Sequence, residues 1–455
     1  MSVARANSII PSSIIIVGGG ASGVVLAAHL LKSPNPDLRV TLIEKRPHFG
    51  QGIAYSTLLS AHVLNVSAAG MSAYADDPLN FWRWLQGRGL ISQEQTPQTP
   101  FYAPRSVYAR YLKEVLDELE AREKETGRLR LIREESLSIS PTSSGVEVVL
   151  ANGTSVVAHL AVLATGHDEQ PGAGQGHAIR MGTEADTALD PEARVLVLGT
   201  GLSMVDAFLS LEQRDHRGEI VAVSRRGLLP SPHRKGNPIK LDVADIPLGT
   251  QLSYFVGWFR DLIRENQKAG IDWRDVVDGL RPFNQKIWQN WPSSAKRRFV
   301  EHTKAWWDIH RHRLAPEVHA RVTEAVRTGR IRPVAGRVVG IEAGDGFTVG
   351  IQSRHTKALE MLQVARIYDC TGIARDISTT SNSVVRSLVD RGLARPDPLR
   401  LGLDVTAKCE IIAGDGTASA KILAVGPLTR GTFFEIDAIP DIRVQCARLS
   451  KQLLG

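Results

Sequence analysis

Residues 14–23 read IIIVGGGASG, and residues 195–204 read VLVLGTGLSM. In each stretch a short apolar run ends in closely spaced glycines, and an apolar helical pattern follows at 24–31 and 205–211. Such runs are typical of buried parallel strands. Glycines at the turn let the backbone approach a pyrophosphate, which then lies on the exposed N–H groups of the next helix. The sequence therefore predicts an α/β fold with two Rossmann-like dinucleotide-binding domains.

The composition places the chain among ordinary globular proteins. Its 455 residues are 43% hydrophobic and 23% charged, and this length predicts two or three domains. The formal net charge is +7, but the basic residues are dispersed, with short clusters only at 225–226 and 296–298. We therefore expect no nucleic-acid partner and interpret the charge as attraction of anionic cofactors or substrates.

The cysteines and the apolar segments further limit the classes of protein to which the chain can belong. Cys370, Cys409 and Cys446 show no paired spacing, which predicts a reducing compartment, no metal site and no dithiol reductase. No segment approaches the roughly 18 apolar residues of a membrane span, and the N-terminal region lacks a signal-peptide pattern. We expect a cytoplasmic protein without membrane association, and its oligomeric state stays open.

The first glycine turn belongs to a β-α-β pattern with strands at 13–17 and 38–44 and a helix at 21–32. Glu44 closes the second strand about 20 residues after the turn, where a carboxylate accepts hydrogen bonds from ribose hydroxyls. Because a carboxylate repels a 2′-phosphate, this unit favours FAD or NAD over NADP. The alternative is an ordinary doubly wound domain with an exposed glutamate.

In the second unit the strand at 219–224 ends not in an acid but in Arg225 and Arg226. Guanidinium groups at this position bind a 2′-phosphate bidentately, so NADPH is favoured over NADH. A surface arginine pair without a ligand is the alternative interpretation.

The remaining pattern predicts how the two units are connected. Thr165-Gly166 and Thr371-Gly372 each follow a strand, as expected where the chain crosses between a flavin domain and an inserted nicotinamide domain. We predict a helix from Arg105 to about 122, a turn at Asn152-Gly153, a linker at 168–190, and a last helix near 440–449; further β segments are expected at 145–150, 155–163, 334–342, 346–352 and 421–425. The expected domains are 1–170 and 366–455 for FAD, with 190–365 for NADPH and a helical insertion at 230–330.

The helical insertion contains six of the eight tryptophans. A tryptophan-rich helical block forms either a core or a substrate cage. Residues 306–313, WWDIHRHR, are dense in polar groups, so they either bind an anionic substrate or form a solvated face.

With both turns in place, the chain resembles the two-dinucleotide-binding flavoproteins, and its closest likeness is the bacterial FAD/NAD(P)-binding family. The residues that carry this resemblance are 52–56, 64–66, 306–313 and 426–435. More distantly, the chain is similar to class B flavin monooxygenases and amino-acid N-hydroxylases. The resemblance implies FAD and NADPH as cofactors, a helix opened by 104–108 under the flavin domain, and Asn65 near the reactive flavin carbon. Met204 and Gly426-Pro427 depart from the usual flavoprotein pattern, which has a small residue and an aspartate there.

These assignments lead to a functional hypothesis. We expect an FAD-dependent, NADPH-consuming monooxygenase, whose C4a-hydroperoxyflavin hydroxylates an amine, an amino acid or another small nucleophile. The alternatives are an NADPH-dependent reductase or dehydrogenase for a small acceptor or protein partner, and a flavin-bound redox sensor. The residues expected to bind cofactors are Gly18, Gly20, Ser22, Gly23, Glu44, Gly52, Asn65, Arg105, Thr165, Gly166, Gly199, Gly201, Ser203, Arg225, Arg226, Thr371, Gly372, Gly426 and Pro427.

Asn65 is the first candidate for direct catalysis. Asn65 would hydrogen-bond the flavin–oxygen adduct or the nicotinamide carboxamide, unless it is a structural turn residue. His62, His167 and His233 are candidate proton donors, solely because they lie near these motifs in the sequence.

Overall fold

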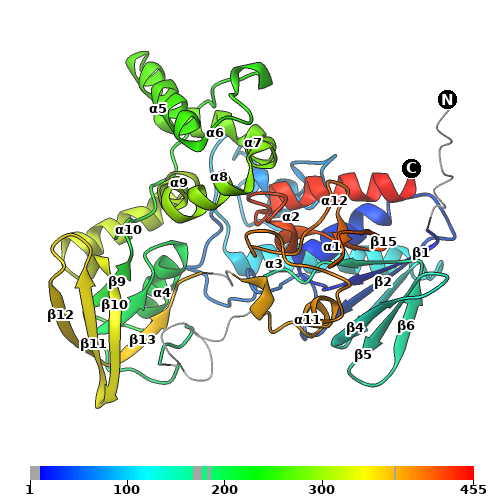
Figure 1. Ribbon diagram of the computed structural model, residues 1–455, viewed down its shortest axis with the longest axis horizontal. Coiled ribbons are helices and arrows are strands. Elements are labelled where there is room, and N and C mark those ends of the chain that lie inside the picture. Colours follow the sequence, from blue (N-terminus) through cyan, green and yellow to red (C-terminus); the bar gives the residue numbers. More distant parts are fainter. Residues whose placement is uncertain (1–10, 168–176, 182–185, 373–375) are drawn as a thin grey trace. The chain divides into compact units, whose positions relative to one another are not determined.

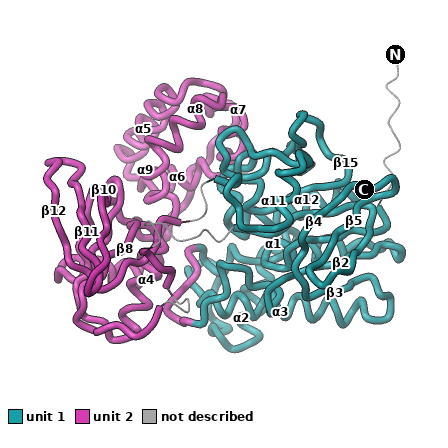
Figure 2. The backbone as a smooth tube through the Cα atoms, turned by 60° about the horizontal axis from the view of Figure 1, so that its bottom comes forward, with its two compact units in different colours: residues 1–58, 66–168, 374–455 teal, residues 59–65, 169–373 magenta. Residues whose placement is uncertain are grey.

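The structure is a computed structural model that describes residues 11–167, 177–181, 186–372 and 376–455 (Figure 1). The chain divides into two compact units (Figure 2). The first unit comprises residues 1–58, 66–168 and 374–455, and the second comprises residues 59–65 and 169–373.

The first unit is built on a six-stranded sheet with strand order β14-β15-β7-β1-β2-β3. Its strands are parallel except for β14, which pairs antiparallel with β15. The strands are β1 (Ser13–Val17), β2 (Arg39–Glu44), β3 (Leu129–Arg133), β7 (Leu160–Leu163), β14 (Glu410–Ile412) and β15 (Ala418–Ala424).

Helix α1 (Ala21–Leu30) lies at the centre of this unit. Every residue of α1 after Ala21 is buried, and the helix packs against α3 and α12. A helix that is apolar all round must be enclosed by other elements, which explains why its sequence lacks the usual polar face. The helices of the unit are α1, α2 (Asn80–Gly87), α3 (Arg105–Arg122), α11 (Ser383–Asp390) and α12 (Ile439–Leu454).

A separate three-stranded antiparallel sheet is formed by β4 (Ser136–Pro141), β5 (Val146–Leu150) and β6 (Ser155–Ala158). The single strand predicted at 155–163 is wrong, because the chain changes sheets at His159. The backbone N–H of His159 donates to the Ser13 carbonyl, and its imidazole Nδ1 lies 2.8 Å from Ser13 Oγ. These contacts end β6 and start β7, which pairs with β1.

The second unit contains a six-stranded sheet with order β12-β11-β10-β9-β8-β13. Strands β13, β8, β9 and β10 are parallel, whereas β10, β11 and β12 form an antiparallel meander. The elements are β8 (Val195–Leu198), α4 (Leu202–Gln213), β9 (Ile220–Ser224), β10 (Ile331–Gly344), β11 (Gly346–Ser353), β12 (Leu359–Val364) and β13 (Arg366–Asp369).

Two features of this sheet differ from the expected boundaries. Strand β10 is longer than predicted, because its first half pairs with β9 and its second half pairs with β11. We expected the flavin domain to resume at residue 366, but residues 366–369 form β13, which pairs with β8 in the second unit.

The segment between β9 and β10 is helical, as its sequence predicts. It contains α5 (Leu252–Lys268), α6 (Trp273–Leu280), α7 (Asn284–Asn290), α8 (Ser293–Arg298), α9 (Lys304–Arg311) and α10 (Pro316–Arg327). Trp288 and Trp291 are buried and pack against Phe299. These tryptophans therefore form a core. None of the helices in the described ranges has the length and apolar character needed to cross a bilayer.

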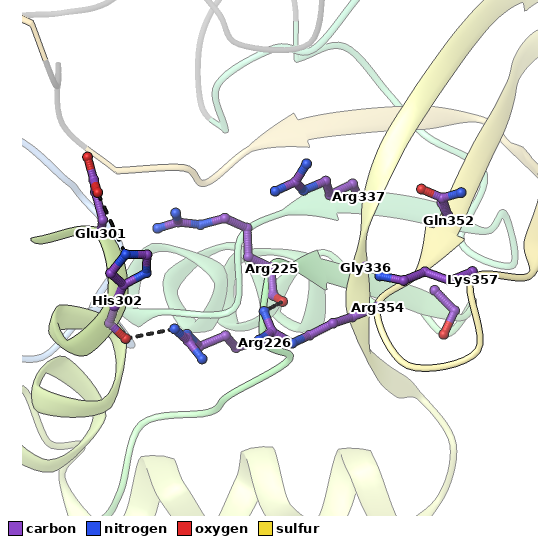
Figure 3. A pocket seen from close by; sticks show the side chains of 10 residues that line it. Arg225, Arg226, Glu301, His302, Gly336, Arg337, Gln352, Arg354 and Lys357 are labelled. Carbon is purple, nitrogen blue, oxygen red and sulfur yellow. Dashed lines mark hydrogen bonds and ion pairs between the residues drawn. The ribbon is translucent and has the colours of Figure 1, made fainter. Parts of the chain in front are cut away.

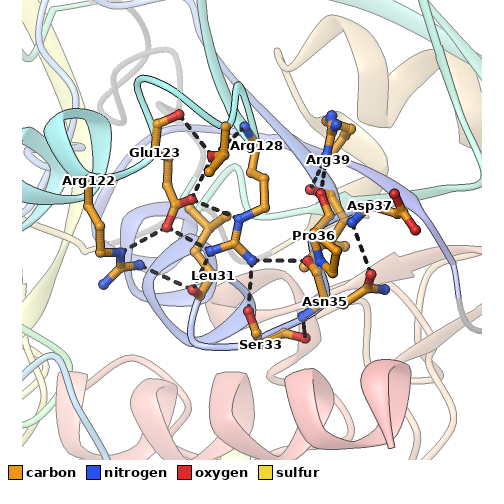
Figure 4. Close-up of polar contacts among 11 residues, drawn as sticks. Leu31, Ser33, Asn35, Pro36, Asp37, Arg39, Arg122, Glu123 and Arg128 are labelled. Atoms are coloured by element: carbon orange, nitrogen blue, oxygen red, sulfur yellow. Dashed lines mark hydrogen bonds and ion pairs between the residues drawn. The ribbon is translucent and has the colours of Figure 1, made fainter.

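The end of α3 is tied to the end of α1 by the buried carboxylate of Glu123 (Figure 4). Arg128 Nε donates to Glu123 Oε2 over 2.7 Å, and Arg122 Nε donates to Glu123 Oε1 over 2.8 Å. The guanidinium of Arg128 also donates to the carbonyls of Ser33 and Asn35 after α1. The Glu123 side chain is 2% exposed, and hydrogen bonds from Arg128 lower its pKa to about 2.

Candidate cofactor-binding site

The first glycine turn can be formed only by glycines at two of its positions. Gly18 has φ of +105°, and a Cβ built on it would lie 2.6 Å from the Ala164 carbonyl oxygen. A Cβ on Gly23 would lie 1.9 Å from the Gly18 carbonyl oxygen. Helix α1 begins after Gly20 without a side-chain cap. The helix N-terminus therefore offers backbone donors to an anion, as a dinucleotide pyrophosphate requires.

Glu44 lies at the end of β2, directly against this turn. Its Oε2 accepts the Gly19 N–H over 2.8 Å, and its Oε1 accepts the Arg46 N–H over 2.9 Å. The residue is only 7% exposed, so these two bonds fix the carboxylate. An ionised carboxylate has about four lone-pair sites, which leaves acceptor capacity for ribose hydroxyls.

Other predicted residues belong to the first unit, and two of the glycines lie close to the same turn. A Cβ on Gly20 would lie 3.3 Å from the Cα of Gly52, and a Cβ on Gly426 would lie 2.6 Å from Ser22 Oγ. The Gly426 N–H donates to Gln445 Oε1 over 2.7 Å, so a glutamine of α12 holds the loop where an aspartate is usual. Gly166 has φ of +72° and faces open space. Arg105 starts α3, and Thr165 and Pro427 belong to the segments that follow β7 and β15.

The second turn repeats the geometry of the first. Gly199 has φ of +118°, and a Cβ on it would lie 2.2 Å from the Cys370 carbonyl oxygen. Helix α4 begins after Gly201, again without a side-chain cap, and a Cβ on Gly201 would meet no heavy atom within 4 Å. Ser203 lies in its first turn, and Thr371 and Gly372 follow β13. Met204 is fully buried, so this unit accommodates a long side chain where the first unit has Gly23.

The end of β9 borders a basic cavity of about 570 Å³, which lies entirely within the second unit (Figure 3). Five cationic side chains and one carboxylate line it, so its field favours an anion. The lining residues are Arg225, Arg226, Glu301, His302, Gly336, Arg337, Gln352, Ser353, Arg354 and Lys357.

The predicted arginine pair is held at this cavity by its own contacts. Arg226 Nη2 donates to the His302 carbonyl over 2.7 Å, and its guanidinium lies 5.8 Å from the centre of the Trp306 ring. Arg354 Nη1 donates to the Arg225 carbonyl over 3.2 Å. Both arginines therefore line the cavity together with other cationic side chains.

Sequence reasoning missed three of the cavity's cations, which are Arg337, Arg354 and Lys357. They come together because β10 and β11 pair with Gly336 opposite Ser353 and Arg337 opposite Gln352. Both strands were predicted, but their register was not. Charged residues near both ends of a predicted hairpin were the only signal available in the sequence.

Asn65 lies in the second unit, within the short segment 59–65. Its backbone carbonyl accepts a hydrogen bond from His233 Nε2 over 2.9 Å. Burial lowers the pKa of His233 to about 4, so this imidazole is neutral near pH 7. His62 is also buried, with its Nε2 2.9 Å from Ser210 Oγ.

His167, the third predicted proton donor, lies in the first unit. Its Nε2 is 3.5 Å from Asp437 Oδ1, and burial lowers its pKa despite this carboxylate.

The polar run at 306–313 divides into two environments. Arg313 is 1% exposed, ion-paired with Asp278, and donates from Nε to the His310 carbonyl. It therefore has a structural role within the helical segment. Trp306, in contrast, is 47% exposed and lies next to Arg226 at the basic cavity. Within the described ranges, no three His, Cys, Asp or Glu side chains converge in a way that would hold a metal ion.

Comparisons with known proteins agree with this arrangement. Residues 15–168 match the model of the FAD-NAD(P)-binding family, and no curated protein matches the sequence. The structure is similar to ornithine N-hydroxylase from Kutzneria sp. 744, with a TM-score of 0.66, 17% identity, and coverage of 97% of this chain and 98% of that chain.

Two further structures show the same fold. Cadaverine monooxygenase from Erwinia amylovora has a TM-score of 0.66 at 14% identity, covering 98% of this chain and 95% of that chain. Bacillithiol disulfide reductase from Staphylococcus aureus has a TM-score of 0.55 at 13% identity, covering 97% and 98%. The chain therefore has the fold of the flavoproteins with two dinucleotide-binding domains, and its residues 15–168 match the FAD-NAD(P)-binding family.

Proposed function

We propose that the protein is an FAD-containing oxidoreductase that consumes NADPH and hydroxylates a small amine. The observation that carries the proposal is the difference between two otherwise matching turns. The first is followed by the buried carboxylate of Glu44, and the second by the basic cavity around Arg225 and Arg226. A carboxylate suits the ribose of FAD, whereas a cluster of guanidinium groups suits the 2′-phosphate of NADPH.

The residues present fit both cofactors. The N-terminus of α1 would bind the FAD pyrophosphate, and Glu44 would orient its ribose. The N-terminus of α4 would bind the NADPH pyrophosphate, and Arg225 and Arg226 would hold the 2′-phosphate. When bound, the two cofactors supply hydride transfer and two-electron chemistry toward oxygen or another acceptor, while the protein supplies binding and orientation.

The cysteines argue against a thiol-dependent reductase. All three are free, and Cys409 and Cys446 are buried. Burial raises the pKa of Cys409 to about 12 and raises the pKa of Cys370 and Cys446 as well. Thiol–disulfide exchange requires an accessible thiolate. Raised pKa values and burial make these thiols poor relays of electrons to a disulfide, which supports oxygen, a small molecule or a protein partner as the electron acceptor.

The substrate class is proposed from the proteins that share the fold. The solved structures include hydroxylases named for ornithine, lysine and cadaverine, each of which has a primary amine. We therefore propose a small primary amine as the substrate and oxygen as the second substrate. A reductase that passes electrons to a non-thiol acceptor is the second candidate.

The first experiment tests the cofactors. The purified protein is expected to be yellow, or to become yellow with added FAD, and anaerobic NADPH should bleach it faster than NADH does. A protein that stays colourless with FAD would overturn the proposal, and bleaching that takes many minutes would favour the redox sensor.

The second experiment separates the monooxygenase from the reductase. The NADPH-reduced protein is mixed with air-saturated buffer containing ornithine, lysine or cadaverine, and hydroxylamine product and peroxide are measured. Product in proportion to NADPH supports the monooxygenase. Peroxide alone with all three amines, together with rapid reduction of a dye, supports the reductase.

A further inference from the structure

The segment 59–65 interrupts the first unit. The chain leaves that unit after Leu58 and returns to it at Val66, and the residues between belong to the second unit. The segment ends on Asn65, which the resemblance to flavin monooxygenases implies lies near the reactive flavin carbon. Contacts that fix the position of the segment 59–65 therefore affect the proposed chemistry.

One attachment of the segment is made by His62. Its Nε2 lies 3.0 Å from the Asp206 carbonyl and 2.9 Å from Ser210 Oγ, and Ser210 Oγ itself donates to the Asp206 carbonyl over 2.9 Å. Because a carbonyl only accepts, the bond to Asp206 requires the proton on Nε2. Both partners lie on α4, the helix whose N-terminus we assign to the NADPH pyrophosphate.

A second attachment is made by His233. Its Nε2–H donates to the Asn65 carbonyl over 2.9 Å, and its own backbone N–H donates to the Leu314 carbonyl over 2.8 Å. Because a carbonyl only accepts, this bond requires the tautomer of His233 that carries the proton on Nε2. Three residues after Asn65, the Ala68 N–H is bonded to the Phe101 carbonyl in the first unit. Asn65 therefore lies between two fixed points of the backbone.

We propose that His62 and His233 are positioning residues, which hold the segment 59–65 against the nicotinamide-binding unit and thereby set the place of Asn65. The proposal rests on the proposed function and adds to it that Asn65 contacts the bound cofactors. A displacement of about 1 Å in a reacting site can cost about two orders of magnitude in rate, so hydrogen bonds that fix one backbone carbonyl can control the hydride-transfer step.

The test uses the full-length holoenzyme and measures anaerobic flavin reduction by NADPH in a stopped-flow instrument. His233→Leu removes the donor, and we expect the limiting rate at saturating NADPH to fall about fivefold, the effect of losing one neutral hydrogen bond. The apparent Kd for NADPH should change by no more than about twofold, since no proposed NADPH contact is lost. His233→Gln keeps an N–H donor and should restore most of the rate.

A double-mutant cycle shows whether His233 acts through Asn65. Asn65→Ala should slow reduction, and adding His233→Leu to Asn65→Ala should cause little further loss, because the two changes remove one shared effect. His319→Leu on α10 serves as the matched histidine control and should leave the limiting rate unchanged. Additive losses in the double variant would overturn the proposal, as would an unchanged rate in His233→Leu.

A second variant covers the case in which His233→Leu does not fold. His62→Leu removes the donor to both partners while α4 keeps its own residues, and it should also lower the limiting rate without weakening NADPH binding. An unchanged rate in His62→Leu would then overturn the proposal. If NADPH does not reduce the wild-type flavin at all, the proposed function fails. If NADPH reduces the wild-type flavin and the variants are reduced at the same rate, the proposed function stands and only the positioning role fails.

Discussion

At the scale of single residues, the two turns are alike in their glycines and differ in the side chain at the end of the next strand, Glu44 in the first unit and Arg225 in the second. In the sequence, Gly18 and Gly199 could be identified because a strand, a tight turn and a helix follow one another directly. Glu44 and Arg225 could be identified because they end the next strand. Arg337 and Arg354 could not, because their place at the basic cavity depends on the pairing of β10 with β11.

The arginine pair leads to a prediction about nucleotide preference. Arg225→Ala combined with Arg226→Ala should raise the KM for NADPH roughly tenfold or more, because each charge-assisted hydrogen bond to a phosphate contributes about 1.5–3 kcal/mol. The KM for NADH should stay nearly constant, since NADH lacks the 2′-phosphate. Steady-state kinetics with both nucleotides measure the ratio of the KM for NADPH to the KM for NADH. Arg217→Ala, at an exposed ion pair of the same unit, is the control; an unchanged NADPH/NADH ratio in the double variant would withdraw the assignment.

At the scale of elements, the patterns predicted the type of most segments but not where the chain changes partners. The break between β6 and β7 arises from the contacts of His159 with Ser13, which are distant in the sequence. The contact between the ends of α1 and α3 also cannot be predicted from the sequence of either helix alone. It depends on Glu123 and Arg128, which look like ordinary charged residues after a helix.

This contact predicts a pH dependence of stability. The pKa of Glu123 is lowered to about 2 in the folded protein, below its ordinary value of 4.5. A carboxyl group with a lowered folded-state pKa stabilises the fold fully above its unfolded pKa, and the contribution is lost as the pH falls from about 4.5 toward 2. Urea unfolding of Glu123→Gln should therefore show a weaker pH dependence in this window than the wild type shows.

The same contact predicts the cost of removing the cation. Arg128→Ala should lower the free energy of unfolding by about 3 kcal/mol at pH 7, because it leaves the Glu123 carboxylate buried with fewer donors. Lys113→Ala breaks an exposed ion pair with Asp117 on α3, and its cost should stay below about 1 kcal/mol. Equal losses in the two variants, measured by urea unfolding, would contradict the structural role given to Arg128.

At the scale of the whole molecule, the two units share one plan. In each, a glycine with positive φ lies against a backbone carbonyl that follows a neighbouring strand, Ala164 for Gly18 and Cys370 for Gly199. A helix without a side-chain cap follows in both units. The charge at the end of the second strand differs between the units, and the proposed binding of FAD by the first unit and NADPH by the second rests on this difference.

This division predicts where each ligand protects the backbone from hydrogen exchange. Adenosine 2′,5′-bisphosphate, which carries the 2′-phosphate without the nicotinamide, should protect amides at 199–205 and 224–227 in the second unit. At 100 times its Kd it should stabilise that unit by about 2.7 kcal/mol, provided it binds only the folded form. Added FAD should instead protect amides at 18–24 and 44–46. Adenosine 5′-monophosphate is the matched control, and its protection of the second unit should be much weaker because it lacks the 2′-phosphate. Protection by the bisphosphate at 18–24 in place of 199–205 would show that the charges beside the two turns do not determine which nucleotide each unit binds. The assignment of NADPH to the second unit would then have to be reversed.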